Sequence, residues 1–202
     1  MSKESFFFIG IAGTGMSALA QYLAQRGHQV LGSDRQFQNE SPAIRAQLES
    51  LGIRCFSQNG EGMHNGIQYA VISTAIEADN PDLRRARELG ISIMHRSELL
   101  ERITREQRTI AVSGTSGKST VTGMIWHILQ HAGLAPSLIS GAALSVLEAR
   151  GMIGNAVAGS GEWLVIEADE SDGTLVRYRP EIGVILNLDR DHKEFEELED
   201  LF

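Results

Sequence analysis

Apolar and polar residues alternate along this chain in two kinds of segment. Short, continuous apolar runs predict buried strands at residues 6–11, 29–32, 69–73, 109–113, 163–168 and 182–188. Longer segments with apolar residues three and four positions apart predict helices at 16–25, 43–51, 81–89, 97–105 and 118–131. Continuous apolar strands that are separated by helices are typical of a parallel sheet covered on both faces. We therefore expect an α/β fold built on parallel sheets.

The strand, glycine loop and helix that open the chain occur a second time, from residue 109 on. Because each opening of this kind is typical of a nucleotide-binding fold, we predict two domains. Residues 1–105 form a Rossmann-like domain, and residues 106–202 form the first part of an α/β domain with a phosphate-binding loop. Phe195, Leu198 and Phe202 continue an amphipathic helical pattern to the last residue, so we expect the second domain to be incomplete.

Composition and charge exclude several classes of protein. Hydrophobic residues make up 42% of the 202-residue chain, which is enough to bury a core. The net charge is −8, most of it from six acids and one lysine in residues 191–202, so general nucleic-acid binding is disfavoured. Cys55 is the single cysteine, which excludes an internal disulfide. No apolar run approaches the roughly 18 residues of a membrane span, and we expect a cytoplasmic protein without membrane association.

The first glycine loop contains Gly10, Gly13 and Gly15, followed by Met16. Glycines let the backbone turn tightly and approach a ligand, and the helix start offers N–H groups to an anion. Asp34 closes the second predicted strand, where a Rossmann-type domain places its ribose-binding acid. The glycine spacing departs from the dinucleotide pattern G-x-G-x-x-G, so we predict a nucleotide site that does not bind NAD(H). The alternative is a tight turn in which Asp34 only caps the next few residues.

The second glycine loop gives a sharper signal. Gly114, Gly117, Lys118 and Ser119 lie between a predicted strand and a predicted helix, which is the context of a phosphate-binding loop. Its N–H groups would cradle the phosphates of a nucleoside triphosphate, the lysine would supply a positive charge, and the serine hydroxyl would bind Mg²⁺. Val112 replaces the first glycine of the strict motif. The alternative is an exposed lysine at a glycine-rich helix start.

Acidic residues follow the predicted strand at 163–168. Glu167, Asp169 and Glu170 stand where open α/β sheets bind ligands, and Mg²⁺ prefers oxygen ligands of this kind. The residues alone do not choose among the three acids, and an acidic strand end can also be a solvated loop. His192 follows the next strand and should lie at the same edge, although imidazole is an unusual Mg²⁺ ligand.

Taken in order, these motifs resemble the Mur ligase family, the ATP-dependent amino-acid ligases of peptidoglycan synthesis, over nearly the whole chain. Within the family the alanine-adding members are the most similar, and the ligases that recycle murein peptides come second. The resemblance rests on the motifs at residues 10–17, 32–34, 73–76, 79–81, 114–120 and 167–172 and on Asn187 with Asp191-His192.

The resemblance implies a three-domain enzyme that joins an amino acid, L-alanine first among the candidates, or a peptide to UDP-N-acetylmuramate. ATP phosphorylates the substrate carboxylate, and the amine then attacks the acyl phosphate. The catalytic residues would be Lys118, Glu167 and His192, and the metal ligands would be Ser119, Glu167 and His192. The ATP-binding residues would be Gly114, Thr115, Ser116, Gly117, Lys118, Ser119 and Thr120. The UDP-sugar-binding residues would be Gly13, Thr14, Gly15, Met16, Asp34, Ser73, Thr74 and Ala75.

Two residues depart from the alanine-adding pattern. Ser116 stands where those enzymes usually carry histidine, and Ser119 where they usually carry threonine. Ser119 keeps the hydroxyl, whereas the residue at 116 leaves the exact substrate open. The C-terminal domain of the family is absent from these 202 residues, so we expect the chain alone to be inactive. A nucleotide-binding module without catalysis is the alternative from another class, and the oligomeric state stays open.

Overall fold

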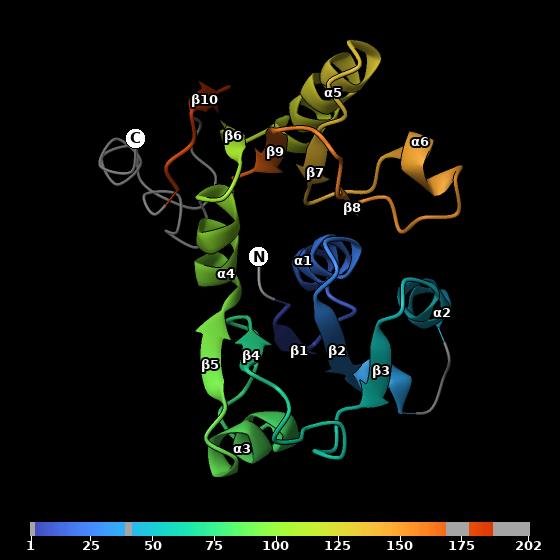
Figure 1. The fold of residues 1–202 in the computed structure, drawn as a ribbon, viewed down its shortest axis with the longest axis vertical. Helices are drawn as coiled ribbons and strands as arrows, with labels where there is room; N and C mark the ends of the chain where they lie inside the picture. Colours follow the sequence, from blue (N-terminus) through green and yellow to red (C-terminus); the bar gives the residue numbers. More distant parts are fainter. Residues whose placement is uncertain (1–2, 39–41, 169–177, 188–202) are drawn as a thin grey trace.

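The computed structural model describes residues 3–38, 42–168 and 178–187, which form two five-stranded sheets with helices around them (Figure 1). The strands of the first sheet (sheet A) are β1 (Ser5–Ile9), β2 (Gln29–Asp34), β3 (Arg54–Ser57), β4 (Tyr69–Ile72) and β5 (Ser92–His95). The strands of the second sheet (sheet B) are β6 (Arg108–Ser113), β7 (Ser137–Ile139), β8 (Ala156–Val157), β9 (Trp163–Glu167) and β10 (Ile182–Ile185). The helices are α1 (Thr14–Gln25), α2 (Ala43–Ser50), α3 (Pro81–Glu88), α4 (Arg96–Thr104), α5 (Lys118–His131) and α6 (Ser145–Glu148), with a 3-10 helix, η1 (Arg35–Phe37).

The six predicted strands and the five predicted helices are all present, so the predicted α/β fold is confirmed. Four strands were not predicted, namely β3, β5, β7 and β8, and each has four residues or fewer. The pairing of β7 with β8 is antiparallel, which departs from the expected parallel arrangement. The amphipathic pattern at residues 195–202 lies outside the described residues.

Sheet A is a parallel sheet whose strand order reverses at its centre. The order is β3-β2-β1-β4-β5, so the chain runs outward from β1 to β3 and then returns to the other side of β1 at β4. All five residues of β1 are buried, because helices cover both faces of this central strand. Ligands of such sheets bind outside the carboxyl ends of the strands at the reversal, which here lies between β1 and β4.

Helix α1 lies between the two sheets (Figure 1). It packs against β2 of sheet A and against β7 and β8 of sheet B, and every residue from Met16 to Leu23 is buried. A helix at the surface of a domain buries only one stripe, so burial all around α1 shows that the two sheets share it. The middle of this helix is therefore held from both sides.

Sheet B surrounds the strand that leads into the second glycine loop. Its order is β10-β6-β9-β7-β8, which places β9 and β10 on either side of β6. The register pairs Val112 with Glu167 on one side and Ser113 with Ile185 on the other. The chain that follows β9 and the chain that follows β10 therefore both leave the sheet beside the second loop.

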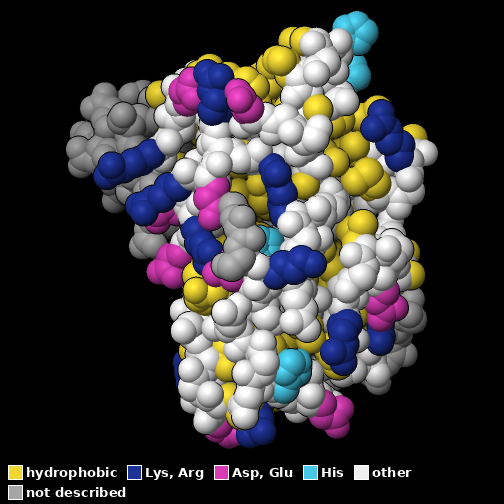
Figure 2. Space-filling model, viewed as in Figure 1, with side chains coloured by type: hydrophobic (Ala, Val, Ile, Leu, Met, Phe, Trp, Pro, Cys, Tyr) yellow, Lys and Arg dark blue, Asp and Glu magenta, His cyan; other side chains and the backbone are white. Residues whose placement is uncertain are grey.

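The surface carries charges of both signs. On the face shown in Figure 2, Lys and Arg side chains lie among Asp and Glu side chains, and the described residues form no continuous basic area there. In the part of the chain that the structure describes, no helix is both long and apolar enough to cross a membrane.

Candidate functional site

The first glycine loop joins β1 to the start of α1. Gly10 has a left-handed backbone (φ +81°), and the N–H groups of Gly10 and Ile11 both donate to the Ser33 carbonyl, at 2.8 and 2.9 Å. Gly13 caps α1 and makes no side-chain capping bond. Because the first N–H groups of a helix have no partner within it, this end of α1 offers donors and a positive dipole end to an anion.

Asp34 holds this loop through the backbone. The carboxylate is buried, its Oδ2 accepts from the Ala12 N–H at 3.0 Å, and its Oδ1 accepts from the Gln36 N–H at 3.1 Å. The second bond caps η1, as the simpler alternative predicted, and the first ties the glycine loop to the end of β2. Contact between Asp34 and a ribose stays a prediction.

A cavity of about 370 Å³ opens in front of the first loop, at the point where the strand order of sheet A reverses. It brings together most of the residues predicted for the UDP-sugar, whereas Asp34 and Ala75 are not among its lining residues. Glu167 of sheet B lines the same cavity, although the sequence assigned it to the metal site. The lining residues are Gly13, Thr14, Gly15, Met16, Leu19, Ser73, Thr74, Arg96, Leu100, Ile139, Ser140, Gly141 and Glu167.

Arg96 is a cavity residue that the sequence analysis missed. It is the first residue of α4 and follows β5, a strand that was not predicted. A Cβ added to Gly15 would lie 3.2 Å from Arg96 Nη1, so the glycine leaves room for this guanidinium. A cation beside the start of α1 adds to the attraction for an anion. An arginine directly after a strand that ends at the ligand edge is the signal that would have found it.

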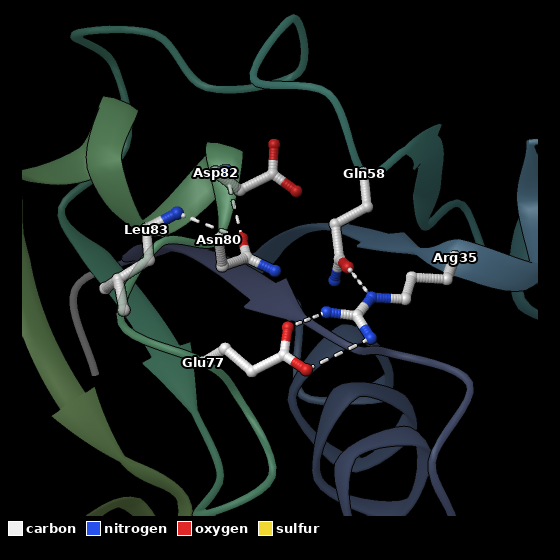
Figure 3. A network of polar contacts seen from close by, with 6 residues as sticks. All are labelled: Arg35, Gln58, Glu77, Asn80, Asp82 and Leu83. Atoms are coloured by element: carbon white, nitrogen blue, oxygen red, sulfur yellow. Dashed lines mark hydrogen bonds and ion pairs between the residues drawn. The ribbon is translucent and has the colours of Figure 1, made fainter.

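Polar contacts tie together the loops behind this edge of sheet A (Figure 3). Arg35 forms an ion pair with Glu77, and its Nε donates to Gln58 at 3.1 Å. Asn80 accepts from the N–H groups of Asp82 and Leu83 at 3.0 and 3.2 Å and so caps α3. These contacts join the segments that follow β2, β3 and β4. They therefore hold the loops at the ligand edge of the sheet in fixed positions relative to one another.

The second glycine loop joins β6 to α5 and folds around its own lysine. Gly117 caps α5 in a left-handed conformation (φ +84°), and Lys118 is the first helical residue. Lys118 Nζ donates to the Gly114 carbonyl at 2.7 Å and lies 3.5 Å from the Thr115 carbonyl. The ammonium group therefore lies over the loop, where a phosphate would meet it. Ser119 and Thr120 follow in the first turn of α5.

Asn187, two residues after the end of β10, holds this loop. Its Oδ1 accepts from the Ser116 N–H at 3.0 Å, and its Nδ2 donates to the Ser116 carbonyl at 3.0 Å. Its own carbonyl accepts from the Thr115 N–H at 3.1 Å. The sequence analysis quoted Asn187 only as part of a motif and gave it no role, because the pairing of β10 with β6 is a long-range contact.

Glu167 lies beside the second loop at the end of β9. Its strand pairs with β6, and the N–H of Ala168 donates to the Val112 carbonyl at 2.8 Å. Glu167 Oε2 accepts from the Gly141 N–H at 2.7 Å, and a Cβ on Gly141 would lie 2.9 Å from the same oxygen. Only glycine at position 141 lets the carboxylate come this close, so the backbone after β7 sets where Glu167 points.

The predicted metal ligands fit Mg²⁺ in part. Glu167 and Ser119 supply oxygen donors at the edge where the second loop lies, which is the donor type that Mg²⁺ prefers. His192, Asp169 and Glu170 lie outside the described residues. Within residues 3–38, 42–168 and 178–187, no three His, Cys, Asp or Glu side chains gather into a group that would hold a metal. The metal set and the ATP contacts therefore stay predictions.

Comparison with known proteins covers the whole of this arrangement. The model of the Mur ligase family, catalytic domain, matches residues 5–108, and the model of the Mur ligase middle domain matches residues 112–201. A UDP-N-acetylmuramate–L-alanine ligase from Synechococcus sp. (strain RCC307) is 42% identical over 200 residues, which are 96% of this chain and 40% of that protein. The ligase of the same name from Cyanothece sp. is 44% identical over 193 residues, 94% of this chain and 38% of that protein. The chain thus spans about two fifths of the length of these relatives.

Solved structures agree. The UDP-N-acetylmuramate–alanine ligase from Thermotoga maritima superposes with a TM-score of 0.81 at 32% identity, over 93% of this chain and 42% of that one. The UDP-N-acetylmuramate:L-alanyl-γ-D-glutamyl-meso-diaminopimelate ligase from Neisseria meningitides gives 0.82 at 25% identity, over 100% of this chain and 67% of that one. Since the two family models together contain both glycine loops and Glu167, the chain belongs to the Mur ligase family.

Proposed function

We propose that this chain is the substrate- and ATP-binding part of a ligase that joins L-alanine to UDP-N-acetylmuramate. The cavity carries the proposal, because it places the first glycine loop and Glu167 around one space. The start of α1 and Arg96 would hold the diphosphate, and the sugar with its carboxylate would extend toward Glu167. The boundary near residue 105 between the UDP-sugar half and the ATP half is part of this proposal.

ATP and Mg²⁺ are the proposed cofactors at the second loop. Lys118 would hold the β- and γ-phosphates, and Ser119 and Glu167 would hold Mg²⁺, with His192 as a further ligand. Mg²⁺ would neutralise charge on the transferring phosphoryl group, and the chain's own groups would position the acceptor carboxylate. The carboxylate would attack the γ-phosphorus of ATP and release ADP. The amine would then attack the carbonyl carbon of the acyl phosphate, lose a proton and expel inorganic phosphate.

Sequence identity favours the alanine-adding reaction over the recycling of murein peptides. The ligases named for L-alanine reach 40–44% identity, whereas the peptide-ligase structure from Neisseria meningitides is 25% identical. Ser116 stands in the second loop, is exposed there and does not line the cavity, so the substitution of the usual histidine would concern the proposed ATP loop. The amino acid would be tested directly by ADP release with L-alanine, glycine and L-serine, on a chain extended past Phe202, since we expect the 202-residue chain alone to be inactive.

Calorimetry on this chain tests the binding half of the proposal. UDP-N-acetylmuramate should bind with one site per chain, UDP-N-acetylglucosamine more weakly because it lacks the carboxylate, and NADH not at all. Tighter binding of NADH than of either UDP-sugar would overturn the proposal. An ATP affinity that does not depend on Mg²⁺ would overturn the assignment of the second loop.

A further inference from the structure

Helix α1 carries a buried polar stripe that faces sheet B. Ser17, Gln21 and Gln25 are four residues apart and so lie on one face of the helix. Gln21 and Ser17 are 0% and 1% exposed. Gln25 Oε1 accepts from the Ala158 N–H at 2.7 Å, one residue after β8. An apolar face would hold the two halves of the molecule together equally well, so the polar stripe calls for its own explanation.

Asn155, directly before β8, is the centre of these contacts. It is 2% exposed, and its Oδ1 accepts from Gln21 Nε2 at 2.7 Å. Its Nδ2 donates to the Thr14 carbonyl at 2.8 Å and to Ser17 Oγ at 3.1 Å. Both amide hydrogens and the amide oxygen are thus used by α1. Buried hydrogen bonds of this kind have strict geometry, so they permit one register of α1 against β8 where an apolar face would permit several.

The same residue reaches the other wall of the cavity through its backbone. The Asn155 carbonyl accepts from the Ser140 N–H at 2.9 Å, and the next N–H, that of Gly141, donates to Glu167 Oε2 at 2.7 Å. Ser140 Oγ also lies 3.4 Å from that oxygen. Thr14 and Glu167 both line the cavity, and Asn155 lies between them in this chain of contacts.

We propose that Asn155 is a positioning residue that holds the first glycine loop in register with Glu167. The identity of the ligand rests on the proposed function: a UDP-sugar anchored at the start of α1 then presents its carboxylate at a fixed place relative to Glu167. Asn155 itself is buried beneath the cavity wall and is absent from the cavity lining, so it acts through Thr14, Ser140 and Gly141.

Binding of two ligands separates positioning from stability. Asn155→Asp keeps the size and the acceptor for Gln21 but replaces the donor that faces the Thr14 carbonyl. It should weaken UDP-N-acetylmuramate about tenfold or more and UDP less than about threefold, because UDP contacts only the first loop. Gln21→Met is the matched control: it removes a bond to the same amide but leaves the donor to Thr14, so both ligands should bind within about threefold of the unchanged chain.

A distance measurement gives a second readout that needs no ligand. Spin labels on cysteines at Ala46 of α2 and His127 of α5, both exposed, report on the two halves. Cys55 is buried and burial raises the pKa of its thiol to about 12, so it should stay unlabelled. We expect one narrow distance distribution for the unchanged chain and for Gln21→Met, and a broadened one for Asn155→Asp.

Each outcome decides a different claim. Absence of UDP-N-acetylmuramate binding to the unchanged chain would overturn the proposed function, while the distance measurement would still test the register. Equal weakening of both ligands by Asn155→Asp, or a narrow distribution with unchanged binding, would overturn the positioning role. If Asn155→Asp is unfolded by circular dichroism, Asn155→Ala takes its place. Unfolding of both, with Gln21→Met folded, would assign Asn155 to stability alone and overturn the proposal.

Discussion

The two glycine loops share one plan, a strand that turns into a helix, but the protein treats them differently. At the first loop the contacts lie behind the backbone: Asp34 accepts from Ala12, and Asn155 donates to the Thr14 carbonyl, which leaves the helix start facing a cavity. At the second loop the contacts use the groups that a phosphate needs. Lys118 bonds the loop's own carbonyls, and the Ser116 N–H bonds Asn187.

This difference indicates two modes of ligand binding. The first loop is preorganised, so a ligand should enter with little change of the backbone. The second loop pairs the Lys118 ammonium group and the Ser116 N–H with groups of the protein itself, so neither of these donors is left unpaired. A ligand there must exchange these internal bonds for bonds to phosphate. The predictions below test this contrast, from the largest expected effect to the smallest.

Lys118→Ala should have the largest effect. Removing the charge at the second loop should weaken Mg²⁺-ATP binding about 100-fold, since a hydrogen bond between charged partners contributes about 1.5–3 kcal/mol. UDP-N-acetylmuramate should bind as before, because Lys118 does not line the cavity of the first loop. Calorimetry with both ligands measures this, and Lys3→Ala, at an exposed position, is the control. Equal loss of both ligands would show that the two loops form one site.

Gly32→Ala should destabilise the fold at the first loop. A Cβ at Gly32 of β2 would lie 2.5 Å from Ile11 Cδ1 and 2.7 Å from the Phe8 carbonyl oxygen, a backbone atom that cannot move aside cheaply. Overpacking of this kind costs about 1–3 kcal/mol of unfolding free energy, measured by urea denaturation. Gly183→Ala in β10 of sheet B is the matched control, because no atom lies within 4 Å of its added Cβ. A loss for Gly183→Ala as large as that for Gly32→Ala would contradict this reading.

Asn187→Ala should loosen the second loop without removing any group that contacts phosphate. It deletes the three hydrogen bonds between the Asn187 side chain and Ser116 and keeps the backbone bond to Thr115. We expect Mg²⁺-ATP affinity to fall about three- to tenfold, because the loop must be ordered by the ligand instead. Tighter ATP binding in the variant would contradict this expectation, because it would mean that breaking the bond from the Ser116 N–H to Asn187 costs more affinity than the ordered loop contributes. Ser145→Ala, an exposed position in α6, serves as the control.

Asp82→Asn should have the smallest effect. Asp82 lies behind the first loop, and we expect its substitution to change how the stability of the fold depends on pH. Burial raises the pKa of the Asp82 carboxyl, against hydrogen bonds from Ser33 and Gly60 that lower it. The folded chain therefore holds this proton more tightly than the unfolded chain, so stability falls as pH rises from about 4 through the raised pKa. Asp82→Asn should remove this fall, measured as the difference in urea denaturation between pH 4 and pH 7. The assignment would be contradicted if Asp82→Asn changed the unfolding free energy equally at pH 4 and pH 7. It would also be contradicted if the exposed Asp79→Asn removed the same fall in stability.

Much of the fold was readable from the sequence because its strongest signals are local. The apolar run that became β1 and the helix that became α5 needed only their own residues for prediction. The strands that were missed have no apolar pattern strong enough to predict a strand: β5 has two exposed residues, and β8 has only two residues in all. They are strands because a neighbouring strand pairs with them. Arg96, which follows β5, was missed for the same reason.

The residues of the candidate site likewise fall into two groups, those with a local sequence signal and those that depend on long-range contacts. Gly13 to Met16 and Glu167 stand in patterns whose chemistry is local, and the structure places them around one cavity. Asn155 and Asn187 act through contacts with residues 141 and 71 positions away, respectively, and no spacing rule predicts such pairs. One is a single asparagine before a short strand, and the other is a single asparagine after a strand. Neither pattern indicates a function until the order of the strands in the sheet is known.

Amide hydrogen exchange at Gly15 and Ser116, followed by NMR on the ligand-free chain and after addition of UDP-N-acetylmuramate, tests the contrast between the two loops most directly. Gly15 lies in the first turn of α1, where helix N–H groups have no internal partner, whereas the Ser116 N–H bonds Asn187 Oδ1 at 3.0 Å. We predict rapid exchange at Gly15 and slow exchange at Ser116 without ligand, and slowing at Gly15 alone when the UDP-sugar binds. Exchange at Ser116 as rapid as at Gly15 in the ligand-free chain, or slowing of both amides by UDP-N-acetylmuramate, would contradict the account.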